Sequence, residues 1–201
     1  MKSVDYSIAY QIQKKYTHRQ HITAYKVGAS NFRSGDFFGC DEVLLGGIPA
    51  NCVFEHEVTR DYKIAELEIM IRVRLTIGAR LRFEILDHCI GFECPEIMVE
   101  NPDGDPFVCI AENCAAGDLL IYDSVDPSDL GSVRVFKNGK IFQLGLMANL
   151  RYDLKSIVEM TVATIDRHRL PCASEELWIA TGGITGVFPI ERGDRFEFDF
   201  E

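Results

Sequence analysis

The chain has 201 residues, of which 47% are hydrophobic and 26% are charged, and its formal net charge is −10. This length fits one domain, and this composition is typical of an ordinary globular core. The acidic balance, without any basic run, disfavours nucleic acid or an anionic membrane as a partner. The sequence has neither the roughly 20 consecutive apolar residues of a membrane span nor a signal-peptide core at its start. We therefore predict a cytoplasmic protein.

The cysteines do not indicate a disulfide framework. There are seven of them, an odd number, and their spacing is irregular. Two pairs have C-x4-C spacing, Cys89 with Cys94 and Cys109 with Cys114. Zinc and iron–sulfur sites normally use tighter spacing, so we expect buried free thiols rather than a metal–thiolate site.

The first half of the chain predicts one helix, two strands and a long loop. Ile8 and Ile12 lie four residues apart in a segment that can form a short amphipathic helix, Val4–Lys15. A short strand is expected over Tyr25–Ser30, followed by a glycine-rich loop over Asn31–Pro49. Charged and apolar residues then alternate over Ala65–Leu75, which is the period-2 pattern of a strand with two unlike faces.

The second half predicts more strands and one long helix. Phe83–Gly91 is expected to be a short helix, and Cys94–Val99 and Leu119–Tyr122 to be strands. Asn138-Gly139, between two further apolar runs, is a strong hairpin signal. Apolar residues at helical spacing predict a helix over Asp153–His168, with Asp153 as its N-cap and Pro171 beyond its end. The final strands are Leu177–Ala180 and Arg195–Phe200. Many strands and few helices favour an α+β domain dominated by a curled mixed sheet.

The feature that points most directly to chemistry is Glu66-Leu67-Glu68. In a strand, residues i and i+2 project from the same face, about 7 Å apart. Two carboxylates that close repel each other, and a divalent cation would relieve the conflict. Glu96 is the candidate for a third ligand because it is a charged residue in an apolar run. The alternative is that Glu66 and Glu68 are an ordinary solvated strand face.

Seven short segments, in colinear order over nearly the whole chain, resemble motifs of the 2-oxo-4-pentenoate hydratase and 4-oxalocrotonate decarboxylase group of the fumarylacetoacetate hydrolase superfamily. No single motif is specific for this group, but seven motifs in the same order along the chain are. The segments are Ala9–Gln13, Tyr25–Ser30, Phe38–Asp41, Ala65–Ile69, Cys94–Ile97, Ala111–Ala115, and Trp178–Gly182 with Gly193-Asp194.

The resemblance implies a fold and a metal site. The fold is a mixed β-sandwich-like roll with few helices, in which residues 1–201 form one catalytic domain with a short helical segment over about 1–20. The implied cofactor is Mg²⁺ or Mn²⁺, bound by Glu66, Glu68 and Glu96. Members of the group are usually oligomers, so at least a homodimer is expected, with a small 2-oxo acid as substrate.

The resemblance also implies a reaction class. A 2-oxo acid would chelate the metal, which would stabilise an enolate during hydration of a 2-oxo-4-enoate or its dienol, or during decarboxylation. Lys26 would lie beside the substrate and pair with its carboxylate or move a proton. Thr181 and Gly182 would donate hydroxyl and backbone hydrogen bonds to it. The implied enzyme is a magnesium-dependent lyase.

One departure leaves the activity open. Family members carry an acid–base aspartate shortly after the segment that corresponds to Phe38–Asp41, and here that stretch is Val43–Gly46. Asp41 and Glu42 lie close by and could take over this role, and Asp41 is the catalytic candidate. The alternatives are an acylpyruvate-type hydrolase, which would need a His–Glu pair near the metal, and a structural partner subunit that has lost its activity.

Overall fold

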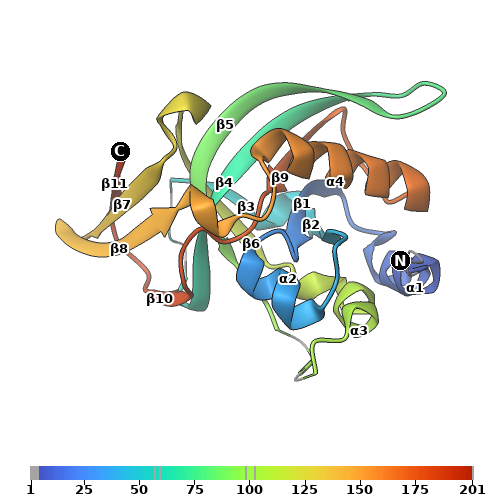
Figure 1. The fold of residues 1–201 in the computed structure, drawn as a ribbon, viewed down its shortest axis with the longest axis horizontal. Coiled ribbons are helices and arrows are strands. Elements are labelled where there is room, and N and C mark those ends of the chain that lie inside the picture. The colour runs from blue at the N-terminus through green and yellow to red at the C-terminus, as the bar shows by residue number, and fades with distance from the viewer. Residues whose placement is uncertain (1–4, 57, 59, 98, 102, 201) are drawn as a thin grey trace.

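The computed structural model describes residues 5–56, 58, 60–97, 99–101 and 103–200. Residues 1–4 of the expected N-terminal segment lie outside this range, and the helix that follows is α1 (Ser7–Thr17). The described strands form a large mixed sheet and a smaller antiparallel sheet, with α1, α2 (Phe32–Phe38) and α3 (Pro106–Ala111) grouped beside the large sheet (Figure 1). The predicted α+β class with few helices is confirmed.

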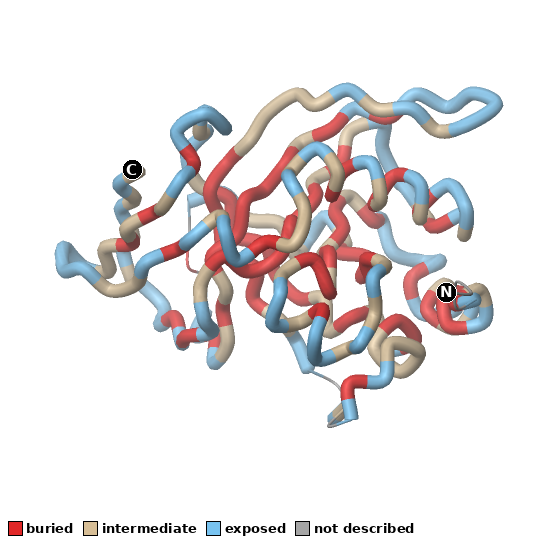
Figure 2. Tube along the Cα trace, viewed as in Figure 1, coloured by how far each residue is buried: buried red, intermediate tan, exposed pale blue. Residues whose placement is uncertain are grey.

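The large sheet has the strand order β2-β1-β9-β4-β5-β6-β3, with β10 paired to β4. Its strands are β1 (Ile22–Gly28), β2 (Leu44–Pro49), β3 (Val53–Glu55), β4 (Tyr62–Thr76), β5 (Arg82–Cys94), β6 (Asp118–Ser124), β9 (Glu176–Ala180) and β10 (Phe188–Ile190). Two of the pairings, β1 with β9 and β3 with β6, are parallel, and the others are antiparallel. The central strands are buried, while the β4–β5 hairpin projects outward with an exposed tip (Figure 2).

The β4–β5 hairpin contains the main error of the sequence prediction. Phe83–Gly91 is predicted to be a helix but belongs to β5, and of the strand predicted over Cys94–Val99 only Cys94, the last residue of β5, is a strand among the described residues. The register between the two strands shifts where Arg72 faces Asp87 and Val73 faces Ile85, which leaves Leu86 as an extra residue in β5. Such a bulge breaks the period-2 alternation that marks a strand. Pro95 follows the last residue of β5 and has no N–H to extend the ladder.

The expected glycine-rich loop contains helix α2 and strand β2 instead. The side chain of Asn31 caps α2 by accepting a hydrogen bond from Ser34 N at 2.8 Å. Gly39 ends the helix in the left-handed conformation, at φ 59°, which a glycine adopts without steric cost. The glycines here therefore serve as a helix terminus and as packing positions of a buried strand.

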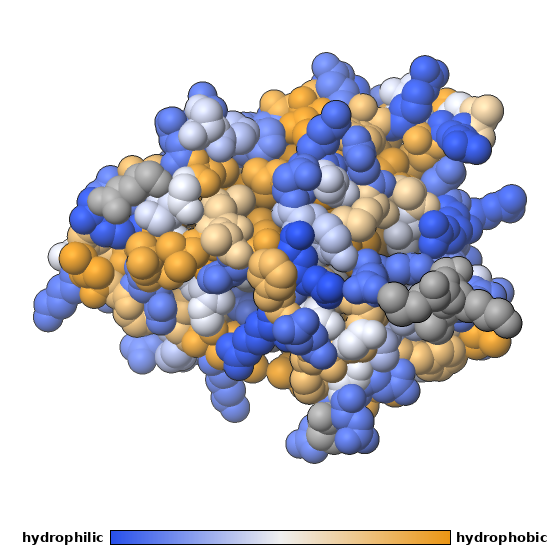
Figure 3. Space-filling model, viewed as in Figure 1, coloured by the Kyte–Doolittle hydropathy of each residue, from blue (hydrophilic) through white to orange (hydrophobic). Residues whose placement is uncertain are grey.

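The smaller sheet has the order β11-β7-β8, with β7 (Ser132–Lys137), β8 (Lys140–Leu146) and β11 (Phe196–Phe200). The hairpin predicted at Asn138-Gly139 is confirmed, since β7 and β8 pair through Lys137 and Lys140. Exposed hydrophobic side chains gather over β8, at the left of the molecule (Figure 3); they are Ile141, Leu144 and Leu146.

Helix α4 (Leu154–His168) packs on the large sheet, and its prediction is confirmed closely. Asp153 is its N-cap and accepts a hydrogen bond from Ser156 N at 2.8 Å. The buried stripe consists of Ile157, Val158, Thr161, Val162 and Ile165. Among the described helices, none is long and apolar enough to cross a membrane.

Candidate metal centre and cavity

Three glutamates from two neighbouring strands meet in the large sheet. Glu66 and Glu68 lie two residues apart on β4, and Glu93 of β5 lies directly opposite Glu66. Directly opposed residues of an antiparallel pair project to the same face. One carboxylate oxygen from each of the three lies within 4.8 Å of the others. The strand geometry expected for Glu66 and Glu68 is therefore observed.

The third member of this cluster is Glu93, and not Glu96 as the sequence predicted. Glu96 lies beyond the end of β5, after Pro95, and it is exposed. The reasoning that selected Glu96, a charge within an apolar run, applies equally to Glu93 in Cys89–Cys94. The predicted helix over Phe83–Gly91 and the predicted strand from Cys94 leave Glu93 in the gap between two elements, which hides its pairing with Glu66.

The cluster brings three carboxylates together, and two of them are buried away from solvent. Glu68 and Glu93 are 1% and 0% exposed. Burial raises the pKa of Glu68 well above its usual range, and the nearby carboxylates of Glu93 and Glu66 raise it further. Burial also raises the pKa of Glu93, to about 7, although the ammonium of Lys26 partly offsets the shift. These carboxylates are held in their charged form only if something positive compensates them.

Lys26 of β1 is the positive group that the structure provides. Its Nζ lies 2.9 Å from Oε2 of Glu93, and its side chain is only 13% exposed. Burial lowers the pKa of Lys26, but the attraction of Glu93, Glu68 and Glu66 outweighs burial and the net shift is upward. With all four side chains ionised, three carboxylates and one ammonium leave a formal charge of −2.

The segment after β9 closes one side of the cluster with backbone. The N–H of Gly182 donates a hydrogen bond to Oε2 of Glu68 at 2.8 Å. A Cβ placed on Gly183 would lie 2.9 Å from Oε1 of Glu66, so the glycine is what allows this close approach. Thr181 is fully buried and does not line the cavity, and its N–H donates to Ile69 O instead. Of the two expected substrate-binding residues in this segment, Gly182 alone reaches the cavity.

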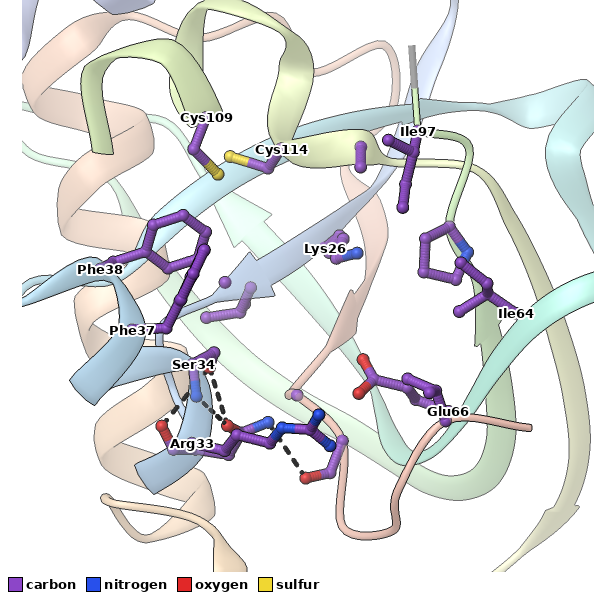
Figure 4. A pocket seen from close by; sticks show the side chains of 18 of the residues that line it. Lys26, Arg33, Ser34, Phe37, Phe38, Ile64, Glu66, Ile97, Cys109 and Cys114 are labelled. Carbon is purple, nitrogen blue, oxygen red and sulfur yellow. Dashed lines mark hydrogen bonds between the residues drawn. The ribbon is translucent and has the colours of Figure 1, made fainter. Parts of the chain in front are cut away.

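A cavity of about 1020 Å³ opens in front of the cluster. Lys26, Glu66, Glu68, Gly182 and Gly183 form its polar wall. The apolar wall comes from α2, from the segment after β5 and from α3, and it borders the space on more than one side (Figure 4). Its members include Phe32, Phe37, Phe38, Ile97, Val99 and Val108. Figure 4 shows the side chains of Phe37, Phe38 and Ile97 around the space in front of Lys26 and Glu66, and the sulfur atoms of Cys109 and Cys114 facing each other in the wall.

Asp41, the expected substitute for the family's acid, does not line this cavity. It lies just after α2 with its side chain 73% exposed and forms an ion pair with Arg151, Nη2 to Oδ1, at 3.1 Å. Among the described residues of the lining, Glu112 is the one carboxylate outside the cluster. The structure thus gives Asp41 a surface ion pair and gives the cavity an acid that the sequence did not single out.

The donor set fits a divalent cation. Carboxylate oxygens are the ligands that Mg²⁺, Mn²⁺ and Ca²⁺ prefer. The formal charge of −2 is balanced by one such ion, and the buried carboxylates have no other strong counter-charge besides Lys26 within the described cluster. Glu66 is only partly buried and lines the open side of the cavity, which leaves room for ligands from water or substrate.

The protein is similar to known proteins in its structure, whereas comparisons of its sequence alone find no match. No protein-family model matches the sequence, and no curated protein matches it. Among solved structures, the chain is similar to 4-oxalocrotonate decarboxylase from Pseudomonas putida G7 complexed with magnesium and adipate, with a TM-score of 0.74 and 19% identity over 98% of this chain and 83% of that one.

Two isomerases are also similar. The 2-hydroxyhepta-2,4-diene-1,7-dioate isomerase from Mycobacterium marinum has a TM-score of 0.58 and 20% identity, over 90% of this chain and 71% of that one. The 5-carboxymethyl-2-hydroxymuconate delta-isomerase from Mycobacterium smegmatis has a TM-score of 0.54 and 21% identity, over 90% and 74%. At these identities the likeness establishes the fold, which is the one that the sequence motifs predicted.

Proposed function

We propose that this protein is a divalent-metal-dependent lyase that acts on small 2-oxo acids, by hydration or by decarboxylation. The observation that carries the proposal is the cluster of Glu66, Glu68 and Glu93 beside Lys26, at the base of a large cavity. The fold shared with a decarboxylase that was solved with magnesium supports it.

Glu66, Glu68 and Glu93 would hold the cation, which is Mg²⁺ or Mn²⁺ in this proposal. When bound, the cation would supply Lewis-acid stabilisation to negative charge that develops on the substrate. The carboxylates themselves are prepared for this role, because the strands fix Glu66 and Glu93 opposite each other and Gly182 N–H orients Glu68. Such preorganisation removes the cost of arranging ligands at the moment of reaction.

Lys26 and the glycine segment would bind and orient the substrate. The ammonium of Lys26 lies in the cavity wall, where it can neutralise the carboxylate of a 2-oxo acid while keeping its ion pair with Glu93. Gly182 and Gly183 offer a surface without side chains, so a planar 2-oxo acid can approach the backbone closely. The apolar wall would restrict water around the reacting atoms.

The same geometry bears on the alternatives. Acylpyruvate-type hydrolysis would need a histidine near the metal, and none is found among the described residues that line the cavity. A purely structural subunit would have no need of three carboxylates packed together, because buried like charges destabilise a fold. The proposal therefore keeps a lyase as the function, with Glu112 in the lining as a residue able to exchange protons with the substrate.

The test is product analysis by ¹H NMR with a panel of 2-oxo acids and 2-oxo-enoates in the presence of magnesium. Addition of water and loss of carbon dioxide give different products, and either one supports the proposal. Glu68→Gln is the matched inactive control, because it removes one ligand charge while keeping the shape of the side chain. Products of C–C hydrolysis, or no magnesium-dependent binding of any of these acids, would overturn it.

A further inference from the structure

The mouth of the cavity is lined by exposed hydrophobic side chains. Five large apolar residues of the lining are each 46–58% exposed, and they come from separate parts of the chain: Phe32, Phe37, Ile97, Val99 and Val187. We call these five residues the apolar rim. Scattered single hydrophobic residues on a surface need no explanation, but a group that surrounds one opening indicates a binding surface.

The apolar rim is continuous with the acid cluster. The same cavity is lined at its base by Lys26, Glu66 and Glu68. In Figure 4, Phe37 and Ile97 stand on opposite sides of the space that leads to Lys26 and Glu66. A ligand whose charged head binds at the cluster would therefore extend directly between these side chains.

The size of the cavity exceeds the needs of a small acid. Its volume of about 1020 Å³ lies at the upper end of the roughly 300–1,000 Å³ typical of sites for drug-sized ligands. A three-carbon 2-oxo acid at the base would leave most of this space, and all of the rim, in contact with water. The shape favours a substrate that has a sizeable second part.

The composition of the lining favours an apolar second part. Outside the acid cluster and Lys26, the described lining carries one cation, Arg33, and one anion, Glu112. Arg33 is the one group there that would attract a second carboxylate, against the five apolar side chains of the rim. The apolar residues, in contrast, gain stability from any hydrocarbon chain that removes them from water.

We propose that the substrate is a 2-oxo acid whose substituent is an extended apolar chain, held by the apolar rim while the 2-oxo acid head lies at the acid cluster. This inference rests on the proposed function and narrows it. It assigns specificity to Phe32 and Phe37 of α2, which do not touch the acid cluster through any described contact. A dicarboxylate of the same length is the competing substrate class.

The experiment is calorimetric titration of the wild-type protein, loaded with magnesium, with pyruvate, 2-oxopentanoate, 2-oxohexanoate and 2-oxoadipate. A fully buried methylene strengthens binding about fourfold, and a half-buried one about twofold. From pyruvate to 2-oxohexanoate, which has three more methylenes, we expect an increase of about tenfold. 2-Oxoadipate has the same three methylenes but ends in a carboxylate, and we expect it to bind no more tightly than pyruvate.

Two rim variants and one control locate the effect. Phe37→Ala and, independently, Phe32→Ala are expected to lower the affinity ratio of 2-oxohexanoate to pyruvate about threefold or more, because each removes apolar surface that the chain contacts. Ile141→Ala is the matched control, since Ile141 is an exposed hydrophobic residue of β8 outside the cavity lining. The ratio should not change in that variant.

The outcomes separate this inference from the proposed function. If pyruvate binds with magnesium but affinity does not rise along the series, or if 2-oxoadipate binds more tightly than 2-oxohexanoate, the apolar-chain inference is wrong and the lyase proposal stands. If the rim variants convert an oligomer into a monomer with an unchanged affinity ratio, the rim is a subunit contact and the inference fails. If no 2-oxo acid binds to the magnesium-loaded protein, both proposals fail.

Discussion

The two walls of the cavity are built from different kinds of structure. The polar wall stands on β1, on β4 and on the segment after β9, and its charged side chains come from strands that are fixed by ladders of backbone hydrogen bonds. Glu93 of β5 faces Glu66 without lining the cavity. The apolar wall stands on α2, a helix of seven residues, and on the segment after β5. Reacting groups need fixed geometry, whereas apolar contact tolerates adjustment. In the function proposed here, the sheet would carry the chemistry and the short helix the selectivity.

The largest expected effect of breaking this arrangement is on the polar wall, through Lys26. In the metal-free protein, Lys26→Met leaves Glu93 buried without its cation, and breaking a buried ion pair costs about 3–5 kcal/mol. We expect the free energy of unfolding, measured with urea, to fall by this amount. The double variant Lys26→Met/Glu93→Gln should recover most of it, because the orphaned charge is removed as well. A single variant as stable as the wild type would mean that the ion pair contributes nothing.

A smaller effect is expected where backbone meets the polar wall. Gly183→Ala would place a Cβ 2.9 Å from Oε1 of Glu66, so the carboxylate must move. We expect magnesium affinity to fall about tenfold, equivalent to about 1.4 kcal/mol, without a change in the circular dichroism spectrum. Gly186→Ala is the matched control, since a Cβ there meets no heavy atom within 4 Å. Equal losses in both variants would show that the effect is not specific to Glu66.

The smallest expected effect is at Asn31, which joins the two walls. Its Oδ1 accepts the hydrogen bond from Ser34 N that caps α2, and its Nδ2 donates to Gly183 O at 3.2 Å. Asn31→Ala should lower the free energy of unfolding by about 1 kcal/mol, as the loss of a helix cap does. Asn31→Asp keeps the cap and should retain more of the stability. Both variants lack the donor to Gly183 O, so an aspartate variant no more stable than the alanine variant would show that the cap does not stabilise the protein.

The two walls also differ in how well the sequence predicted them. The alternation in Ala65–Leu75 correctly places Glu66 and Glu68 on one face of a strand, because a two-residue period is a local property. The partner strand is not predicted because the bulge at Leu86 interrupts its alternating pattern. For the same reason the sequence does not place Glu93 opposite Glu66. Which residue of β5 faces Glu66 depends on the register of the hairpin, which the bulge at Leu86 shifts by one residue.

The helix that forms much of the apolar wall could not be predicted from the sequence, for a different reason. Frequent glycine over Asn31–Pro49 indicated a loop, although Asn31 and Gly39 are the two ends of a short helix. Seven residues show less than two full helical turns, which is too few for a reliable period. Asp41 was chosen as a substitute acid by its nearness in sequence, but it lies outside the cavity and pairs with Arg151. The helix predicted over Asp153–His168 and the hairpin predicted at Asn138-Gly139 are confirmed, because each prediction depends only on nearby residues.

The most direct test of the account is calorimetric titration of magnesium into the wild type, Glu93→Gln and Glu96→Gln. The structure places Glu93 in the cluster and Glu96 on the surface, three residues further along. We predict that Glu93→Gln weakens magnesium binding by about 100-fold or more, since even the loss of an outer partner of a metal ligand costs about 10- to 100-fold, and that Glu96→Gln leaves the affinity within about twofold of the wild type. Loss of binding in Glu96→Gln with retention in Glu93→Gln, or no binding by the wild type, would contradict the central claim.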